Sequence, residues 1–261
     1  MDHREPTTNS PRGVAWITGA SSGIGRALAL RLARDGWRVA ASARRAEELA
    51  RLAAEARDMA GDIHAFPLDV TDPATVTGCV TDLEAQLGPL DLMVLNAGSY
   101  EPMPAESFSA ATLRRLIDLN VMGVAHAIEA ALPRLLARGR GRIAIVASLA
   151  GYAGLPYAAA YGAGKAALIN MAEALRPELL AKGIVVQVIN PGFVRTPLTD
   201  RNDFPMPFLV TAEQAAAAIA RGLDGDRFEI AFPWLFVRLL KLVRMLPYRF
   251  YFALTRRMVR Q

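Results

Sequence analysis

Short apolar runs alternate along the chain with longer segments that carry helical patterns. The runs are four to seven residues long and rich in Val, Ile, Leu and Ala, which favours buried strands. We expect strands at residues 14–18, 38–42, 63–68, 91–95, 142–147, 184–189 and 228–232.

The intervening segments carry helix signals. Residues 46–59 are rich in Ala, Glu and Arg, and residues 110–137 form the longest helical pattern. Pro73 after Asp72 is typical of a helix start. Thr211 and Gln214 fit a capping box ahead of an Ala-rich segment. Strands that alternate with helices predict an α/β fold, a Rossmann-like doubly wound parallel sheet in a single domain.

The order of these segments divides the chain into three parts. Residues 1–12 form a polar lead-in without the apolar core of a secretory signal, and we expect them to be flexible. Residues 13–232 contain every expected strand and no linker, so we predict one nucleotide-binding catalytic domain there. Residues 233–261 form a basic C-terminal tail.

Composition and cysteine content limit the kinds of protein to which this chain can belong. The chain has 261 residues, 52% hydrophobic and 21% charged, which favours a large folded core over disorder. Cys79 is the only cysteine, which suits a reducing compartment, so we expect a cytoplasmic protein. The three histidines are scattered, so we expect no metal site.

The positive charge belongs to the tail. Seven of the 30 Lys and Arg residues, and none of the 25 acidic residues, lie in residues 238–261. The rest of the chain therefore holds 23 basic and 25 acidic residues, a net charge of −2, within the overall +5. This distribution argues against nucleic-acid binding by the body of the protein.

A glycine-rich stretch, TGASSGIG, joins the first expected strand to a helical pattern. Gly19, Gly23 and Gly25 would let the backbone turn sharply and approach a pyrophosphate, which the N-terminus of the helix would bind. A plain strand–helix connector is the alternative explanation. The position directly after the first strand favours a dinucleotide site.

The end of the second expected strand bears on the choice of dinucleotide. An acidic residue there would bind the ribose 2′-hydroxyl of NAD, but the sequence reads Ala43-Arg44-Arg45. Guanidinium groups suit a 2′-phosphate, so we expect NADP(H). A solvated basic start to the next helix is the alternative.

Tyr161 and Lys165 stand four residues apart, which places them on one helix face. A neighbouring cation favours the phenolate, so we expect Lys165 to lower the pKa of Tyr161 and make it an acid/base group. Ser148, at the end of a strand, could hold a carbonyl oxygen as charge builds on it. Taken alone, this spacing occurs by chance in many chains, and an ordinary Tyr and Lys on a small-residue helix would be the favoured explanation.

These motifs occur together and in order, and in this the sequence resembles the short-chain dehydrogenase/reductase family in its compact single-domain branch. The matching motifs are TGASSGIG, Asp69-Val70, Asn96-Ala97-Gly98, Asn120, Ser148, Tyr161-x-x-x-Lys165, Pro191-Gly192 and Val194-Arg195-Thr196.

The resemblance implies a catalytic tetrad of Asn120, Ser148, Tyr161 and Lys165. Tyr161 would be the acid/base, Ser148 would polarise the carbonyl, and Asn120 would hold a water in a proton relay. Lys165 would bind the nicotinamide ribose and lower the pKa of Tyr161.

The resemblance, together with the loop and the arginines, predicts the cofactor site. Asp69 and Val70 would contact the adenine, Asn96 would brace the sheet, and residues 191–196 would lie along the nicotinamide amide. The full set is Gly19, Ser21, Ser22, Gly23, Ile24, Gly25, Arg44, Arg45, Asp69, Val70, Asn96, Ala97, Gly98, Tyr161, Lys165, Pro191, Gly192, Val194 and Thr196.

We therefore expect an NADP(H)-dependent oxidoreductase that interconverts a carbonyl and an alcohol on a hydrophobic, lipid- or steroid-like substrate. The expected substrate residues are Ser148, Leu155, Tyr157 and Phe193, with Tyr100 and Met103 nearby and a lid of Phe204, Met206 and Phe208. Core and lid packing would explain the same apolar residues. A 3-ketoacyl thioester reductase and a non-catalytic NADP(H)-binding sensor or scaffold are the alternatives.

The tail departs from the compact branch, which puts the usual tetramer packing of the family in doubt. We expect a homodimer. Residues 233–246 and 248–260 form two amphipathic helical patterns separated by Pro247, with Arg238, Lys241 and Arg244 in one stripe. A basic amphipathic helix suits peripheral contact with an anionic membrane, at the inner face of that membrane. Packing on the body or on a second subunit is the alternative, but the charge separation favours the membrane.

Overall fold

The computed structural model describes residues 12–200 and 205–259, so most of the expected flexible lead-in lies outside the described residues. Seven strands form one parallel sheet in the order β3-β2-β1-β4-β5-β6-β7. They are β1 Val14–Thr18, β2 Arg38–Ala43, β3 Asp62–Pro67, β4 Leu90–Leu95, β5 Gly141–Val146, β6 Ile184–Pro191 and β7 Glu229–Phe232. Every expected strand is present, with its ends displaced by at most two residues.

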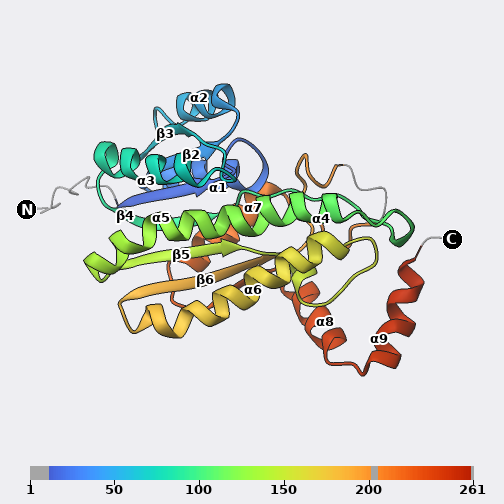
Figure 1. Cartoon of the computed structure of the whole chain (residues 1–261). Coiled ribbons are helices and arrows are strands. Elements are labelled where there is room, and N and C mark those ends of the chain that lie inside the picture. The colour runs from blue at the N-terminus through green and yellow to red at the C-terminus, as the bar shows by residue number, and fades with distance from the viewer. Residues whose placement is uncertain (1–11, 201–204, 260–261) are drawn as a thin grey trace, which may run out of the picture.

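Helices connect the strands as the sequence predicts (Figure 1). They are α1 Gly23–Arg34, α2 Ala46–Glu55, α3 Pro73–Leu87, α4 Ala110–Ile117, α5 Gly123–Arg138, α6 Ala159–Leu180 and α7 Ala212–Leu223. Asp72 caps α3 by accepting from two backbone N–H groups, and the capping box of Thr211 and Gln214 is confirmed. Helix α2 ends four residues before the predicted position, because the chain turns so that the Gly61 N–H reaches the Ala33 carbonyl.

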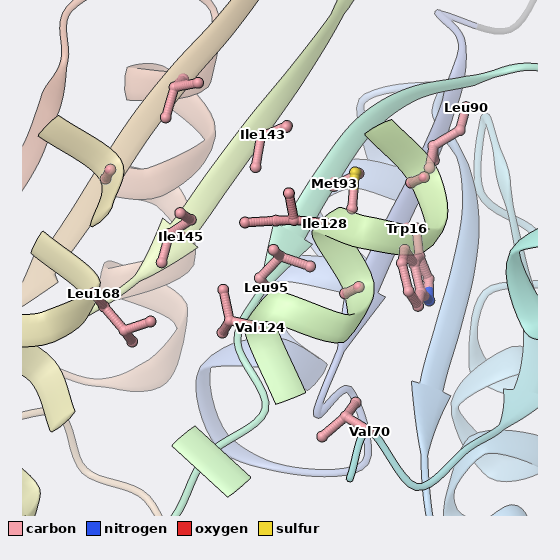
Figure 2. Packing of buried hydrophobic residues seen from close by; sticks show 14 of the residues in the cluster. Trp16, Val70, Leu90, Met93, Leu95, Val124, Ile128, Ile143, Ile145 and Leu168 are labelled. Carbon is pink, nitrogen blue, oxygen red and sulfur yellow. The ribbon is translucent and has the colours of Figure 1, made fainter. Parts of the chain in front are cut away.

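Each face of the sheet has its own core, and alternate residues of a strand belong to different cores. Val14 and Trp16 of β1 pack with α3, α5 and α6, whereas Ala15 and Ile17 pack with α1, α2 and α7. Figure 2 shows the first core, with Val124 and Ile128 of α5 beside buried residues of β4. The doubly wound prediction is confirmed.

The expected long helix is interrupted by a π-helical turn over Asp118–Met122. The whole stretch Ala110–Arg138 is long and apolar enough to cross a membrane by length and composition alone. It also carries arginines at positions 114, 115, 134 and 138, and Val124, Ile128 and Leu135 are buried in the first core. We therefore interpret it as a core helix.

The strand order reverses between β1 and β4, and this positions the site. From β1 the chain proceeds to β2 and β3 on one side, while β4 leads to β5, β6 and β7 on the other. The connections after β1 and β4 therefore diverge, which opens a crevice at the carboxyl ends of the two strands. Thr18 ends β1 and Asn96 follows β4 at this crevice.

The tail forms two helices, α8 Trp234–Arg244 and α9 Tyr248–Thr255, with Pro247 between them as predicted. A short 3₁₀ turn, Arg256–Met258, follows. Figure 1 shows the pair beside α6, at the end of the molecule toward which β5 points. The tail thus lies at the same end of the sheet as the crevice.

Candidate active site

The loop between β1 and α1 is tightly folded against its neighbours. Gly19 has φ +69°, and a Cβ on Gly25 would lie 2.5 Å from the Gly19 carbonyl oxygen. No side chain caps α1, whose N-cap residue is Ser22. The first N–H groups of α1 therefore face the crevice end, where they can bind phosphate oxygens. This cradle fits a pyrophosphate.

Asn96 braces the same loop from β4, as the resemblance predicts. Its Nδ2 donates to the carbonyl oxygens of Thr18 at 3.0 Å and Gly19 at 3.2 Å. In return, the Thr18 hydroxyl oxygen accepts from the backbone N–H groups of Asn96 and Ala97 at 3.0 and 3.1 Å. Thr18 is a positioning residue that the sequence reasoning missed, although it opens the TGASSGIG motif.

Arg44 and Arg45 are both exposed at the end of β2, but they differ in their partners. Arg45 donates to the Ser21 hydroxyl at 3.0 Å and so closes over the loop. Arg44 lies near Asp69, and its charge helps lower the pKa of that carboxyl, although the main cause is the hydrogen bond from the Thr71 backbone. Two arginines and one acid thus surround the expected adenosine end of the site.

Three polar side chains meet at the carboxyl end of β5. Tyr161 is half-buried in the first turn of α6, and Lys165 is 4% exposed one turn later. The Lys165 Nζ lies 5.7 Å from the Tyr161 ring centroid and donates to the Val146 carbonyl at 2.8 Å. Ser148 follows β5, and its hydroxyl oxygen accepts from the Ala150 N–H at 3.1 Å. The Ser148 proton therefore remains available for donation.

The pKa of Tyr161 corrects one expectation. Burial raises this pKa, and the hydrogen bond with Ser148 only partly opposes the rise. The ammonium of Lys165, which we expected to lower this pKa, donates to the Val146 carbonyl. Burial also lowers the pKa of Lys165 to about 8.

Asn120 lies in the π turn and is fully buried. Its carbonyl oxygen accepts from the Ser99 N–H at 2.7 Å, and its Nδ2 donates to the Ser99 carbonyl at 2.9 Å. The Asn120 side chain thus fixes the loop after β4. This loop lies beside Lys165, since a Cβ on Gly98 would lie 2.9 Å from the Asn120 Oδ1 and 3.7 Å from the Lys165 Nζ. The water relay of Asn120 stays a prediction.

The segment after β6 faces the phosphate loop. A Cβ on Gly23 would lie 3.0 Å from the Thr196 Cγ2, so the two segments nearly touch. Thr199 stabilises this segment, because its hydroxyl accepts from the Thr196 N–H at 3.0 Å and donates to the Val194 carbonyl at 2.6 Å.

One pocket joins these parts. Its lining is Ile24, Asn96, Gly98, Ser99, Val146, Ala147, Ser148, Tyr161, Lys165, Pro191, Gly192, Val194, Thr196, Leu198 and Thr199. Sequence reasoning anticipated most of the lining, but it missed Ser99, Val146, Ala147, Leu198 and Thr199. The remaining predicted cofactor residues lie around the loop and at the ends of β2 and β3.

The expected substrate residues are less well placed. Leu155, Tyr157 and Phe193 lie outside this lining. Met103, which we expected near them, is 4% exposed and packs with Leu116 and Ala160. Of the others, Tyr100 meets the Tyr161 ring edge-on at 5.2 Å, while Phe204 lies outside the described residues.

A polar network behind Ser148 was not anticipated. Glu229 of β7 accepts hydrogen bonds from Tyr152, from Asn190 and from Lys241 of α8. Tyr152 follows Ser148 by one turn, and Asn190 directly precedes Pro191. The network therefore links the tail to both sides of the pocket. No spacing signal in the sequence relates these four residues.

Comparison with known proteins adds to this geometry. A family profile described as short chain dehydrogenase matches residues 13–204. An uncharacterized oxidoreductase of Myxococcus xanthus is 40% identical over 94% of this chain and 96% of its own length. A 2-dehydro-3-deoxy-L-rhamnonate dehydrogenase (NAD(+)) of a Sphingomonas species is 32% identical over 78% of this chain and 85% of its own.

A solved structure is similar as well. A short-chain dehydrogenase from Sphingobium yanoikuyae in complex with NADPH has a TM-score of 0.78 and 30% identity. The match covers 86% of this chain and 89% of the other.

Proposed function

This chain belongs to the short-chain dehydrogenase family, and on that premise we propose that it is an NADP(H)-dependent oxidoreductase that interconverts a carbonyl and an alcohol on a hydrophobic substrate. The observation that carries the proposal is the meeting of Ser148, Tyr161 and Lys165 with the phosphate loop in one pocket. In this proposal residues 13–232 form the catalytic domain and residues 233–261 an attached tail.

The protein's own groups handle the oxygen and its proton. Bound NADP(H) supplies or takes up the hydride. Ser148 donates its hydroxyl proton to the carbonyl oxygen when substrate is bound, since its oxygen already accepts from the Ala150 N–H. Tyr161 transfers a proton to or from the same oxygen. Burial raises the pKa of Tyr161, so at neutral pH the phenol holds a proton that it can donate.

The end of β2 supports NADP(H) over NAD(H). No acid stands at residues 43–45, where β2 ends, and the exposed Arg44 carries a guanidinium fork that suits a 2′-phosphate. The similar structure that holds NADPH supports the same choice. The similar dehydrogenase named for NAD(+) supports the opposite one. We give the chain's own residues more weight.

Aromatic side chains near the pocket support a hydrophobic substrate. Tyr100 meets Tyr161, and Phe236 of α8 stacks on Phe193 at 5.8 Å and on Phe208 at 5.6 Å. A 3-ketoacyl thioester reductase would use the same Ser148, Tyr161 and Lys165, so only the substrate separates it from our proposal. A non-catalytic NADP(H)-binding sensor would not need Ser148 or Tyr161 as reacting groups, and their convergence with Lys165 argues against it.

The test is a substrate panel followed by NADPH absorbance. We expect free hydrophobic ketones or aldehydes to be reduced faster than acyl-carrier thioesters, with NADPH preferred over NADH. Tyr161→Phe should lose at least about a hundredfold in kcat, the usual contribution of a general acid. It should keep its affinity for NADPH, because only the hydroxyl is removed. If Tyr161→Phe kept most of its kcat, the catalytic assignment would be wrong.

Two proposals concern location and assembly. We propose peripheral contact with the inner face of a membrane through the tail, since its exposed surface is apolar and basic. The homodimer expected from the sequence stays a prediction, because the structure describes one chain.

A further inference from the structure

We propose that α8 and α9 together form a docking surface for the interface of an anionic lipid bilayer, which holds the mouth of the site against the lipid. Lipid binding itself is independent of the proposed reaction. Only the delivery of a hydrophobic substrate rests on the proposed function.

Helix α8 has two apolar faces, and the protein covers only one of them. Phe236, Val237 and Leu240 pack against the first core of the sheet. The opposite face remains in solvent, with Trp234 65% exposed. It consists of Trp234, Leu235, Leu239, Leu242 and Met245. Packing of the tail on the body therefore explains only the inner apolar face of α8. Within the described residues, no other element covers its outer apolar face.

Helix α9 extends the exposed apolar surface. Tyr251 and Thr255 are its only buried residues, while Tyr248, Phe250, Phe252 and Leu254 are exposed. In the described parts of the chain, 11 of the 16 exposed large hydrophobic residues follow Pro233. An apolar surface concentrated in this way marks an interaction site rather than scattered surface residues.

The charge of this surface selects the partner. Within residues 12–200 and 205–259, no carboxylate lies within 4.0 Å of the tail arginines 238, 244, 249, 256 and 257. Lys241 is the one tail cation paired with an acid there, Glu229. Arginines interleaved with exposed aromatic residues suit an anionic lipid interface. A twofold dimer through this surface would bring the basic surface of one copy against the same basic surface of the other. Repulsion between the like charges opposes such a dimer.

The docking surface is attached to the pocket. The Tyr251 hydroxyl donates to the Gly154 carbonyl, in the loop between Ser148 and Tyr161. Phe236 contacts Phe193 and Phe208 on the other side. A lipid surface bound to α8 and α9 would therefore lie next to both walls of the site, where a hydrophobic substrate could pass directly from the bilayer.

Co-sedimentation of the full chain with vesicles tests the proposal without any turnover. At low salt we expect binding to phosphatidylcholine vesicles that contain 30% phosphatidylserine, weaker binding to phosphatidylcholine alone, and release at high salt. The triple variant Arg249→Glu, Arg256→Glu, Arg257→Glu should bind at least tenfold more weakly. Its matched control is Arg57→Glu, Lys182→Glu, Arg221→Glu, which makes the same charge change at exposed positions of the body.

A second measurement places the contact on α8. Brominated lipids in the anionic vesicles should quench tryptophan fluorescence through the exposed Trp234, whereas Trp16 is buried. Trp234→Phe should remove most of the quenching and keep the sedimentation. The proposal is overturned if the full chain stays in the supernatant at low salt, or if the control triple weakens binding as much as the tail triple. Tail-dependent self-association without lipid binding would identify a second copy as the occupant instead.

Discussion

At the scale of single residues, backbone partners fix each polar side chain of the site. Lys165 donates to the Val146 carbonyl, Ser148 accepts from the Ala150 N–H, and Asn120 exchanges two hydrogen bonds with Ser99. Each side chain therefore has one defined orientation before a ligand binds, which is the preorganisation that catalysis requires.

Arg44→Ala should weaken the binding of NADPH much more than the binding of NADH. Loss of a charge-assisted hydrogen bond costs about 1.5–3 kcal/mol, so the preference for NADPH should fall roughly tenfold or more. The measurement is KM for both cofactors. Arg51→Ala is the matched control, since Arg51 is exposed on the adjoining helix and pairs with Glu48. Equal affinity of the unchanged protein for NADPH and NADH would refute this role of Arg44.

Lys165 should make stability depend on pH in the alkaline range. Its pKa is lowered from 10.5 to about 8 by burial, so below pH 8 the ammonium is charged in both the folded and unfolded states. Between about pH 8 and 10.5 the unfolded chain binds more protons, so the free energy of unfolding rises with pH. The rise is at most about 1.4 kcal/mol per pH unit. It is fully present above pH 10.5 and is lost as the pH falls to 8.

Urea unfolding of the unchanged protein and of Lys165→Met at pH 7, 8, 9 and 9.5 measures this contribution. We expect the difference in unfolding free energy between the two proteins to change in favour of the unchanged protein as the pH rises above 8. A difference that stays constant across the series would show that Lys165 titrates near its ordinary pKa.

At the scale of elements, the strands and most helices could be predicted because their signals are local. Apolar runs mark the strands, and Asp72 and Thr211 mark helix starts through side chains that cap their own backbone. We did not predict the π turn at Asp118–Met122, in which the Asn120 side chain bonds to Ser99, a residue distant in the sequence. The end of α2 depends likewise on a distant contact, between Gly61 and Ala33.

The same distinction applies to the site. Residues within the phosphate loop and the Tyr161 motif could be placed from spacing, since each motif is one strand end or helix turn. Glu229 and the three side chains bound to it come from four separate segments, and no sequence spacing relates them. Leu155, Tyr157 and Phe193 are apolar loop residues, whose composition predicts burial but not which cavity they line.

Helix α9 should hold the loop between Ser148 and Tyr161 in place through the hydroxyl of Tyr251. Tyr251→Phe removes the bond to the Gly154 carbonyl and should cost about 1 kcal/mol of stability. We expect KM for the carbonyl substrate to rise while the affinity for NADPH is unchanged, because the loop borders Ser148 and Tyr161 but not the phosphate loop. Tyr248→Phe is the control, since Tyr248 is 76% exposed on the same helix. An unchanged KM in Tyr251→Phe would show that the contact only holds the tail in place.

At the scale of the whole molecule, the sheet separates two cores, and the pocket and the tail share one of its ends (Figure 1). The division of charge follows the same geometry, with a net charge of −2 before residue 238 and +7 from residue 238 onward. The molecule should therefore approach an anionic surface with its tail first. That orientation brings the carboxyl ends of the strands toward the lipid.

Delivery of the substrate should depend on this orientation. The unchanged protein and the variant with Glu at positions 249, 256 and 257 can be compared on a hydrophobic ketone dissolved in anionic vesicles. We expect the unchanged protein to reduce this ketone several-fold faster. A small water-soluble ketone should be reduced equally by both proteins. Equal rates with the vesicle-borne ketone would separate lipid docking from substrate supply.

The π turn has a further consequence for how the longest helix is read. A regular α-helix turns by about 100° per residue, so a turn with one extra residue shifts the phase of all that follows. Before the turn, Leu116 packs in the small cluster with Met103, and after it Val124 and Ile128 face the sheet. Deleting one residue within 118–122 would rotate α5 by about that angle and turn its sheet-facing stripe aside. The two halves of this helix therefore have the same period but different phases. A single helical wheel drawn through both halves would place the residues of one half on the wrong face.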